Sequence, residues 1–598
     1  MNRRRSVTRR RLVWLAMGLA AGAWLASPAW AERPNAPKLL PKSTAALVWV
    51  PDAPEMAERY KTTSLGQMLQ DPQVKPLINQ LYGAAAEAVA NAEDRIGLSL
   101  SELMAIPQGE LAVALVAPDD RKPELVVLMD VGDQLSNARK LLDRVTAALE
   151  QSGARKTEKR IGDTKLAIYE GVGEKKQTLI FFEKDSTVVV GSGAESLGEV
   201  IAHWNGDNES DTLARDADFA AVMRRSGRKE QKPHLIWYAD PIGLMRSIGQ
   251  ESPGVQLTLA MFPALGLDGV TALGGSITFD AGEFDSVAVS HVLLEAPRDA
   301  ILKMIAFKPG KIEPEPWVPG DAASYMTLHW DFQTTFDELV AVVDSFRGEG
   351  ALSQIVGKRS LDAVGIDVEK ELLPALAGRV SLCSRIQRPI TLRSAATAIG
   401  FELNDPHALD EALERIATKH EFLLERKVYA GNEYFQVVSP GRNDRPDAPP
   451  RPIPCFGIVG DYLMLTNHPG LYEAVSLTSQ GGMERLADSP EFKLVASNIR
   501  RQSGGAEPAM ISFDRPQEGL RFYYELGTAD ENRQKLRENA EKNPFLKTLD
   551  TALDENPLPP FAVIEQYFAP SGALLVDDAT GLHYLGFSLR RKAESDGE

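Results

Sequence analysis

One stretch of this sequence occurs twice, and the repetition constrains the fold more than any other feature. Residues 96–115 and residues 364–382 both run from a short apolar segment through an acidic helical turn and a glycine into a predicted strand. The two glycines, Gly109 and Gly378, are 269 positions apart. Self-similarity at a fixed spacing indicates an internal duplication. The repeated unit is therefore a little under half of the 598-residue chain.

Other landmarks recur in the same order at nearly the same spacing. The separation stays between 269 and 278 positions for three further pairs, which are Pro41 and Pro319, Arg144 and Arg415, and Phe219 and Phe492. These landmarks divide the mature chain into a first repeat domain, residues 32–313, and a second, residues 314–598. The seam at residues 311–319 is rich in proline, which predicts an extended and fairly stiff connection.

The pattern within each half predicts a mixed fold. Strands are predicted over residues 111–117 and 124–131, followed by a helix over residues 135–151. Similar runs occur in the second half, and each half closes with a predicted hairpin, at residues 273–293 and 573–589. Because hairpins outnumber strand-helix-strand crossovers, we expect an α+β fold. It would consist of two homologous mixed domains with largely antiparallel sheets and helices packed on one face.

Residues 1–31 have the form of an export signal. An arginine-rich start is followed by an apolar run over residues 12–25 and by Ala29-Trp30-Ala31, which fits the small-x-small cleavage rule. The apolar run is shorter than the roughly 20 residues that a membrane span needs. We therefore expect cleavage and export to the periplasm, the cell surface or the medium, with no membrane span afterwards. The Sec route is favoured over the twin-arginine route, whose pattern is incomplete here.

Net charge limits the partners of the exported chain. Residues 1–31 contain six arginines and no acid, so removing them lowers the net charge from −17 to −23. A protein this acidic is repelled by the phosphate backbone, and no nucleic-acid partner is expected.

Three phrases of the sequence resemble a known family. They are LPKSTAALVWVPD at residues 40–52, GIDVEKELLPALAGRVSL at residues 365–382 and ADSPEFKLV at residues 487–495. They are similar to exported bacterial proteins grouped as a domain of unknown function, number three-three-five-two. The resemblance covers nearly the whole mature chain in both halves. It implies secretion or surface display with a mixed architecture, and it assigns no activity and no functional residue.

The motifs of common enzymes and metal sites do not occur in the sequence. The eight histidines form neither HExxH nor HxH, and no GxSxG elbow is present. One SxxK match, residues 226–229, lies in a charged run without the SDN or KTG motifs that accompany it in penicillin-binding enzymes, so a solvated loop is the favoured interpretation. No catalytic residue, metal site or cofactor is predicted.

The chain has two cysteines, Cys383 and Cys455. In an oxidising compartment they form a candidate disulfide. The alternative is that both are small buried hydrophobic residues. The bridge is slightly favoured, because the repeat register suggests that the two positions are neighbours.

The second half contains a proline-rich insertion, residues 439–454, where the first half has a short loop. Proline at this density predicts an extended surface segment. A partner-docking loop would use Arg442, Arg445, Pro449, Pro450 and Arg451. A tolerated insertion in a hairpin loop is favoured over docking.

Three functions compete on these observations. The leading hypothesis is a non-catalytic extracytoplasmic binding or structural protein, with an unknown protein or a small apolar ligand as partner. The second is a carrier that holds an apolar or peptide ligand in a groove between the repeats, since domain interfaces often bind ligands. The third is a hydrolase of unrecognised type. A contiguous apolar surface would favour the carrier, and a fully charged groove would exclude it.

Overall fold

The structure is a computed structural model. It describes residues 33–80, 105–119, 121–173, 177–227, 231–249, 252–391, 394–438, 452–540 and 544–591. The predicted export signal and the predicted docking residues, Arg442, Arg445, Pro449, Pro450 and Arg451, lie outside the described residues.

The first half contributes ten described strands. They are β1 Thr44–Val50, β2 Leu111–Val116, β3 Glu124–Asp130, β4 Arg155–Ile161, β5 Thr164–Val172, β6 Gln177–Lys184, β7 Thr187–Gly191, β8 Leu235–Ala239, β9 Val270–Ala281 and β10 Phe284–Leu294. Its described α-helices are α2 Ala36–Leu39, α3 Ala53–Lys61, α4 Ser64–Gln70, α7 Leu135–Gln151, α8 Ala194–Trp204, α9 Ala217–Ser226, α10 Pro241–Ile248 and α11 Pro253–Leu265.

The second half contributes another ten. They are β11 Ser324–His329, β12 Leu376–Ile386, β13 Ala395–Leu403, β14 Leu424–Tyr429, β15 Asn432–Val437, β16 Cys455–Val459, β17 Tyr462–Thr466, β18 Met510–Asp514, β19 Ser571–Asp578 and β20 Gly581–Leu589. Its described α-helices are α12 Phe332–Arg347, α13 Ala351–Ser353, α14 Arg359–Ala363, α15 Leu373–Ala375, α16 Asp410–Lys419, α17 Pro469–Ser479, α18 Pro490–Gln502, α19 Pro516–Thr528, α20 Asp530–Ala540, α21 Pro544–Glu555 and α22 Phe561–Glu565.

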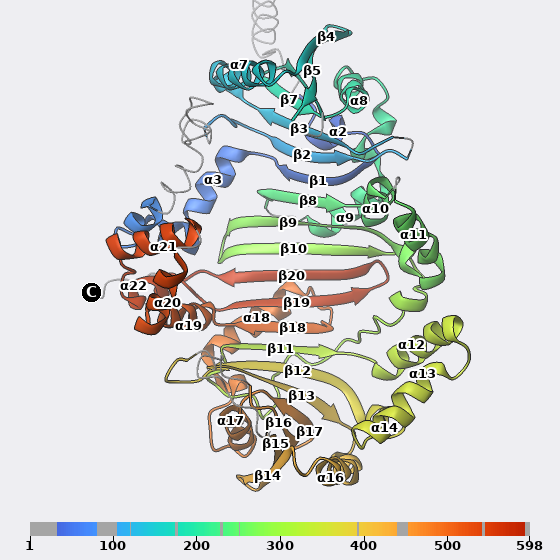
Figure 1. The fold of residues 1–598 in the computed structure, drawn as a ribbon, viewed down its shortest axis with the longest axis vertical. Coiled ribbons are helices and arrows are strands. Elements are labelled where there is room, and N and C mark those ends of the chain that lie inside the picture. The colour runs from blue at the N-terminus through green and yellow to red at the C-terminus, as the bar shows by residue number, and fades with distance from the viewer. Residues whose placement is uncertain are drawn as a thin grey trace, which may run out of the picture.

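All twenty strands form one continuous antiparallel sheet (Figure 1). From edge to edge the order is β4-β5-β6-β7-β3-β2-β1-β8-β9-β10 and then β20-β19-β18-β11-β12-β13-β17-β16-β15-β14. The second half repeats the pairing pattern of the first in reverse direction across the sheet. The halves meet where β10 pairs with β20, with Ala288 opposite Gly586.

The α+β class with an antiparallel sheet is confirmed. The division into two homologous domains stays a prediction, although the shared pairing pattern agrees with it. One repeat landmark has the same local environment in both halves. The backbone N–H of Phe219 donates to the Asp216 side chain at the start of α9, and that of Phe492 donates to Ser489 at the start of α18.

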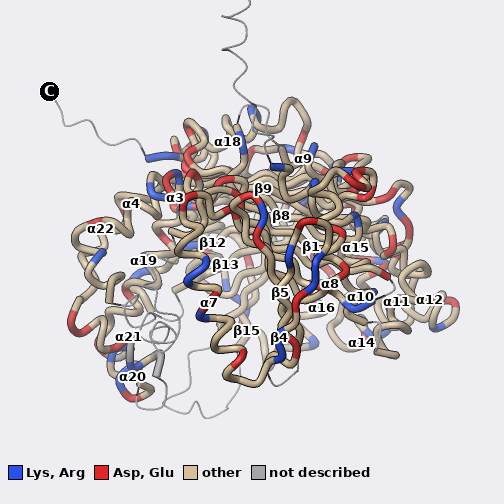
Figure 2. Tube along the Cα trace, turned by 90° about the horizontal axis from the view of Figure 1, so that it is seen from above, with Lys and Arg blue, Asp and Glu red and all other residues tan. Residues whose placement is uncertain are grey.

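The sheet is curved, and its two faces differ. Seen from above (Figure 2), α9 and α18 lie on one side, and the outer strands β4 and β15 bend toward the other side. We call the side of α9 and α18 the convex face and the opposite side the concave face. Helices α10 to α14 lie at one end of the strands, and α3 with α19 to α22 lie at the other end (Figure 1).

The main hydrophobic cores lie on the convex face. In the first half, Leu47 and Ala114 pack with residues of α8 and α9 such as Val200 and Val222. The core of the second half extends across the junction, because it includes Phe284 of β10 together with residues of β20. The aromatic rings of Phe284 and Phe587 are 5.0 Å apart. The two halves are therefore joined by both backbone pairing and shared packing.

The seam is part of the second-half core. Trp317 and Val318 are almost fully buried in that core. Their packing limits the flexibility of the seam. The two halves also meet away from the sheet, where the Tyr567 hydroxyl donates to the Asp71 carboxylate over 2.6 Å.

No described helix combines the length and the apolar character that crossing a bilayer requires.

Each half contains a buried ion pair that links the segment before its first strand to the residue after the repeated glycine. In the first half Arg33 pairs with Glu110, and in the second Arg379 pairs with Glu315 over 2.7 Å. The signs of the two positions are therefore reversed between the halves. The second pair is the more deeply buried, with side-chain exposures of 7% and 0% against 13% and 8%.

Candidate ligand-binding face

Side chains along a strand point alternately to the two faces of a sheet, and paired residues share a face. Val48 of β1 lies opposite Val113 of β2 and Trp237 of β8. Their neighbour Leu47 lies opposite Ala114, and both belong to the convex core. Val48, Val113 and Trp237 therefore point to the concave face.

The first half presents an apolar patch on this face. Three of its side chains are strongly exposed, Val48 at 49%, Val113 at 41% and Leu125 at 44%. The pairing register places further apolar residues beside them on the same face: Ala46, Leu111, Leu115, Val127, Leu235, Leu273 and Ile277. Single exposed hydrophobic residues are ordinary, but neighbouring ones across several strands indicate a binding surface.

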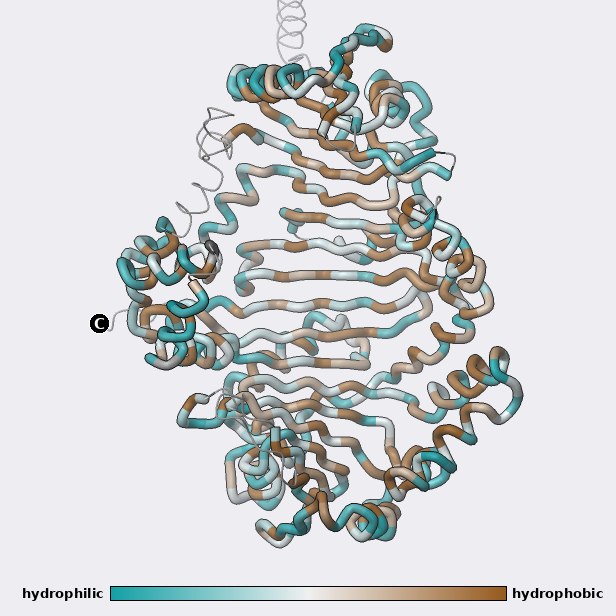
Figure 3. Tube along the Cα trace, viewed as in Figure 1, coloured by the Kyte–Doolittle hydropathy of each residue, from teal (hydrophilic) through white to brown (hydrophobic). Residues whose placement is uncertain are grey.

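The second half presents a matching patch. The register places these apolar residues on the concave face: Met326, Leu328, Val380, Leu382, Ile399, Phe401, Leu463, Leu465, Met510 and Leu575. Leu465 is 39% exposed. Figure 3 shows hydrophobic residues along β1 to β3 and along β12 and β13. The concave face therefore carries apolar side chains from both halves.

Small residues, among them Gly275 and Gly586, lie between the two patches. One aromatic side chain from each half, Trp237 or Tyr584, packs over one of these glycines. A Cβ atom added to Gly275 would come 2.7 Å from the Trp237 indole nitrogen, and one added to Gly586 would come 2.9 Å from the Tyr584 hydroxyl. Such contacts are closer than packed atoms allow, so the two glycines leave room for the Trp237 and Tyr584 side chains in these positions.

Helices cover this face only toward its outer ends among the described residues. Helix α7 packs on Met129, Val188 and Val190, and α16 packs on Leu403 and neighbouring apolar residues. The apolar patches lie between these two covered ends. Further apolar side chains are exposed on or directly after the helices at one end of the strands: Ile248, Leu257, Met261, Leu339, Phe346, Leu361 and Val364.

One titratable group stands on the concave face near the junction. Asp514 of β18 lies opposite Ser324 and Ser571. Burial raises the pKa of its carboxyl to about 6. The charge of this group therefore changes between mildly acidic and neutral pH.

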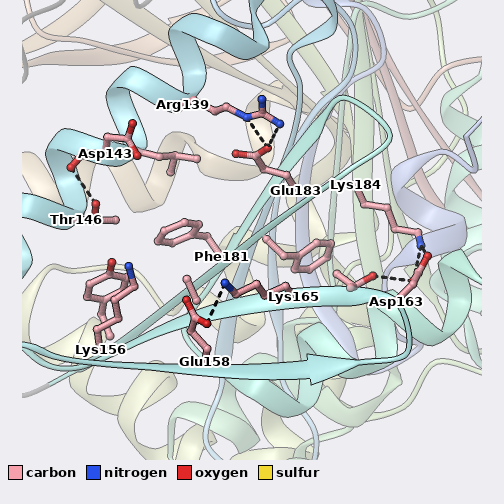
Figure 4. A pocket seen from close by; sticks show the side chains of 15 residues that line it. Arg139, Asp143, Thr146, Lys156, Glu158, Asp163, Lys165, Phe181, Glu183 and Lys184 are labelled. Atoms are coloured by element: carbon pink, nitrogen blue, oxygen red, sulfur yellow. Dashed lines mark hydrogen bonds and ion pairs between the residues drawn. The ribbon is translucent and has the colours of Figure 1, made fainter.

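A separate hollow lies between α7 and the strands β4 to β6 (Figure 4). Its volume is about 470 Å³. Three of its four cations are paired with acids inside the hollow, since Arg139 contacts Glu183 at 2.8 Å, Lys165 contacts Glu158 at 2.9 Å and Lys184 contacts Asp163 at 3.2 Å. The fourth, Lys156, lies 3.9 Å from Glu150, outside the lining. The charges of the six side chains in the three inner pairs are balanced within the hollow. A charged ligand would therefore find fewer unpaired partners there than the lining residues suggest.

The predicted disulfide between Cys383 and Cys455 is wrong. Cys383 lies opposite Ala398, which belongs to β13, and Cys455 lies opposite Thr466, which belongs to β17. Strands β13 and β17 pair with each other, so two strands separate the cysteines. At about 4.8 Å per strand the Cα atoms are roughly 14 Å apart, about twice the span of a disulfide.

Both thiols are free and buried. Burial raises the pKa of Cys383 to about 12 and that of Cys455 to about 11. A thiol that stays protonated at neutral pH is a poor nucleophile and a poor metal ligand. The interpretation of both cysteines as small buried hydrophobic residues is therefore the one that the structure supports.

Ser226 of the SxxK match is also placed differently from the expectation of a solvated loop. It is the last residue of α9 and is 1% exposed. The described residues contain no group of three or more histidine, cysteine or acidic side chains that could hold a metal ion.

Sequence reasoning did not identify the concave face, although a signal was present. The run Leu111–Val116 is apolar at every position, so both of its faces are apolar. A strand of this kind is buried on both sides or presents one apolar side to a ligand.

The chain matches no family model, no curated protein and no solved structure at a level that would indicate relationship.

Proposed function

We propose that this protein is a non-catalytic extracytoplasmic binding protein that holds the acyl chains of a lipid against its concave face. The observation that supports the proposal most strongly is the pair Val48 and Val113. They lie opposite each other on the adjacent strands β1 and β2 and remain 49% and 41% exposed. A ligand that covers these side chains gains roughly 25 cal/mol of binding free energy for each Å² of apolar area removed from water.

The chemistry of the face favours an acyl chain over a peptide. Backbone N–H and C=O groups within the sheet already pair with neighbouring strands, so a ligand on the face meets mainly side chains. A bound peptide usually adds to a free strand edge, where unpaired backbone groups are available. At one edge, β4 is instead polar and exposed at every residue but its last, as is common for edges protected against pairing.

This proposal develops the second of the sequence-based hypotheses. The apolar ligand would lie across the shared sheet rather than in a groove between separate domains, because β10 and β20 pair directly. Export from the cytoplasm and the absence of catalytic activity both stay predictions of the sequence.

The experiment is a titration with phosphatidylcholine that carries a pyrene-labelled acyl chain. We expect the double variant Val48→Glu, Val113→Glu to bind at least about tenfold more weakly, since a carboxylate is costly in an apolar contact. The matched control is Leu494→Glu on α18, because Leu494 is 55% exposed on the convex face. The control should bind like the unchanged protein.

Equal binding by the double variant and the unchanged protein would contradict the proposal. A second copy of the chain is the competing occupant of this face. If sedimentation shows a dimer that the double variant converts to a monomer, while pyrene-lipid does not bind, the face is a dimer interface and the proposal fails.

A further inference from the structure

The convex side of the first half contains an apolar cavity, distinct from the concave face. Its volume is about 450 Å³, within the range of small-molecule sites. It lies between α2, α9 and the strands β1, β8 and β9. Apolar side chains form most of its walls: Pro37, Trp49, Phe219, Ala220, Met223 and Ile236.

One residue that lines this cavity, Ser226, has a buried hydroxyl without a partner in the described part of the chain. Ser226 lines the cavity, is 1% exposed, and its Oγ has no hydrogen-bond partner among the described residues. Its backbone carbonyl, in contrast, accepts a hydrogen bond of 2.6 Å from Ser276. Leaving a buried hydroxyl unpaired costs about 1–3 kcal/mol. Rotation of the Ser226 side chain to another staggered rotamer would bring the hydroxyl to the cavity wall, where a ligand that accepts its hydrogen bond would remove this cost.

The charged residues of the cavity have one sign. Lys38 and Arg224 line it and are exposed, and neither forms an ion pair within the described part of the chain. No aspartate or glutamate is among the described residues that line it. The hollow in Figure 4 is the contrast, because its Arg139, Lys165 and Lys184 each contact an acid. In a chain of net charge −17, two such cations indicate an anionic ligand.

The cavity is not a necessary feature of the repeated fold. At the spacing of 273 set by Phe219 and Phe492, Ser226 corresponds to Ile499, which is fully buried in the second-half core. At the spacing of 278 set by the first strands, Lys38 corresponds to Pro316. The second half thus has apolar residues where the first half has Ser226 and Lys38, and it has the uncharged Ser497 where the first half has Arg224.

We propose that this cavity binds a single-chain aliphatic carboxylate. The aliphatic chain packs against Trp49, Met223 and Ile236, and the carboxylate lies with Lys38 and Arg224 at the mouth and accepts a hydrogen bond from Ser226. The cavity and the concave face lie on opposite sides of the sheet, so this proposal does not depend on the proposed function.

Calorimetric titration with dodecanoate, below its micelle concentration and near pH 7.5, tests the proposal. Dodecyltrimethylammonium supplies the same chain with the opposite charge, and we expect it to bind at least tenfold more weakly. The double variant Lys38→Ala, Arg224→Ala should weaken dodecanoate binding at least tenfold. The control Lys42→Ala, Arg215→Ala removes two exposed cations that do not line the cavity and should leave the affinity unchanged.

Two further variants separate the chain contact from the charge. Ala220→Trp fills the cavity and should abolish dodecanoate binding, whereas Ala221→Trp, at the next helix position outside the lining, should not. Ser226→Ala should weaken binding severalfold without lowering the melting temperature. The concave-face variant Val48→Glu, Val113→Glu should bind dodecanoate normally.

The proposal is overturned if dodecanoate does not bind to the unchanged protein. It is also overturned if Ala220→Trp, folded by its melting temperature, binds as well as the unchanged protein, or if dodecyltrimethylammonium binds equally well.

Discussion

The two halves of this protein use one strand pattern but place opposite charges at its most buried ionic position. Glu110 follows Gly109 in the first half, and Arg379 follows Gly378 in the second. Each finds its partner in the segment before the first strand of its half, Arg33 or Glu315. The difference teaches that the fold needs an ion pair at this point and not a particular sign.

The surroundings of the two pairs differ as well. Glu110 also accepts hydrogen bonds from the Trp49 indole N–H, over 2.6 Å, and from the backbone N–H of Ala36, over 2.8 Å. Glu315 accepts hydrogen bonds from the Tyr325 hydroxyl, over 2.8 Å, and from the Ser381 hydroxyl, and its side chain is completely buried. The second half is therefore the more tightly closed of the two, in agreement with the filled position at Ile499.

The largest effect should come from breaking the deeper pair. Arg379→Met leaves Glu315 charged and buried without its counter-ion, and we expect a loss of about 3–5 kcal/mol in the free energy of unfolding. Urea denaturation measures it. The exchanged variant Glu315→Arg, Arg379→Glu copies the sign of the first half and should recover part of the loss. If it is as unstable as Arg379→Met, the position does require one sign.

The next largest effect on stability should come from Ile499, the buried residue that corresponds to Ser226 at the cavity. Ile499→Ala removes a fully buried side chain and should cost about 2–4 kcal/mol. Ser226→Ala removes an unpaired hydroxyl at the equivalent position and should be neutral or stabilising by up to about 1 kcal/mol. Urea denaturation of both variants checks the opposite signs. A loss of more than about 1 kcal/mol in Ser226→Ala would mean that its hydroxyl has a partner.

The junction of the halves should be sensitive to acid. His583 of β20 lies opposite His291 of β10, and the two rings are 5.9 Å apart. Burial first, and then the Arg225 charge, lowers the pKa of His583 to about 4, and Asp578 acts in the opposite direction. The folded state therefore holds this ring neutral where the unfolded chain would protonate it.

The direction of the pH effect on stability follows from the lower pKa of His583 in the folded state than in the unfolded state. The stabilising contribution of the neutral ring is complete above about pH 6.5 and is lost as the pH falls from there toward 4, by up to roughly 3 kcal/mol. Urea denaturation across pH 4–7 should show a steeper loss for the unchanged protein than for His583→Gln. Equal slopes would show that this histidine does not titrate abnormally.

The smallest effect should come from the more exposed pair. Glu110→Gln keeps an oxygen for Trp49 and Ala36 and removes only the charge facing Arg33, which solvent can reach. We expect a loss of about 1–2 kcal/mol in the free energy of unfolding, smaller than that of Arg379→Met. A loss as large as that of Arg379→Met would remove the distinction between the halves.

The local elements of this fold could be predicted well from the sequence. The helix predicted over residues 135–151 agrees with α7, and the strand predicted over residues 124–131 agrees with β3 to within one residue. Strand β4 was missed because all but its last residue are exposed, so it has no alternation of apolar and polar residues.

The order of strands across the sheet could not be predicted locally. The wrong prediction of a disulfide between Cys383 and Cys455 arose because the strand order was unknown. Both cysteines belong to the second half, but β13 and β17 lie between their strands. The concave face depends on the same order, since its patches combine residues from distant strands. The cavity beside Ser226 depends on how α9 packs on the sheet. The charged residues around Ser226 indicated a solvated loop, so this packing could not be predicted from the sequence.

The central claim is that lipid acyl chains lie on the concave face, and photo-crosslinking tests it most directly. Phosphatidylcholine carrying a diazirine in one acyl chain is bound, irradiated and mapped by peptide mass spectrometry. The account predicts labels in β1, β2, β12 and β13, at Val48, Val113 and Leu382 or beside them. Labels confined to α9 and α18 on the convex face, or no labels above those of the Val48→Glu, Val113→Glu variant, would contradict it.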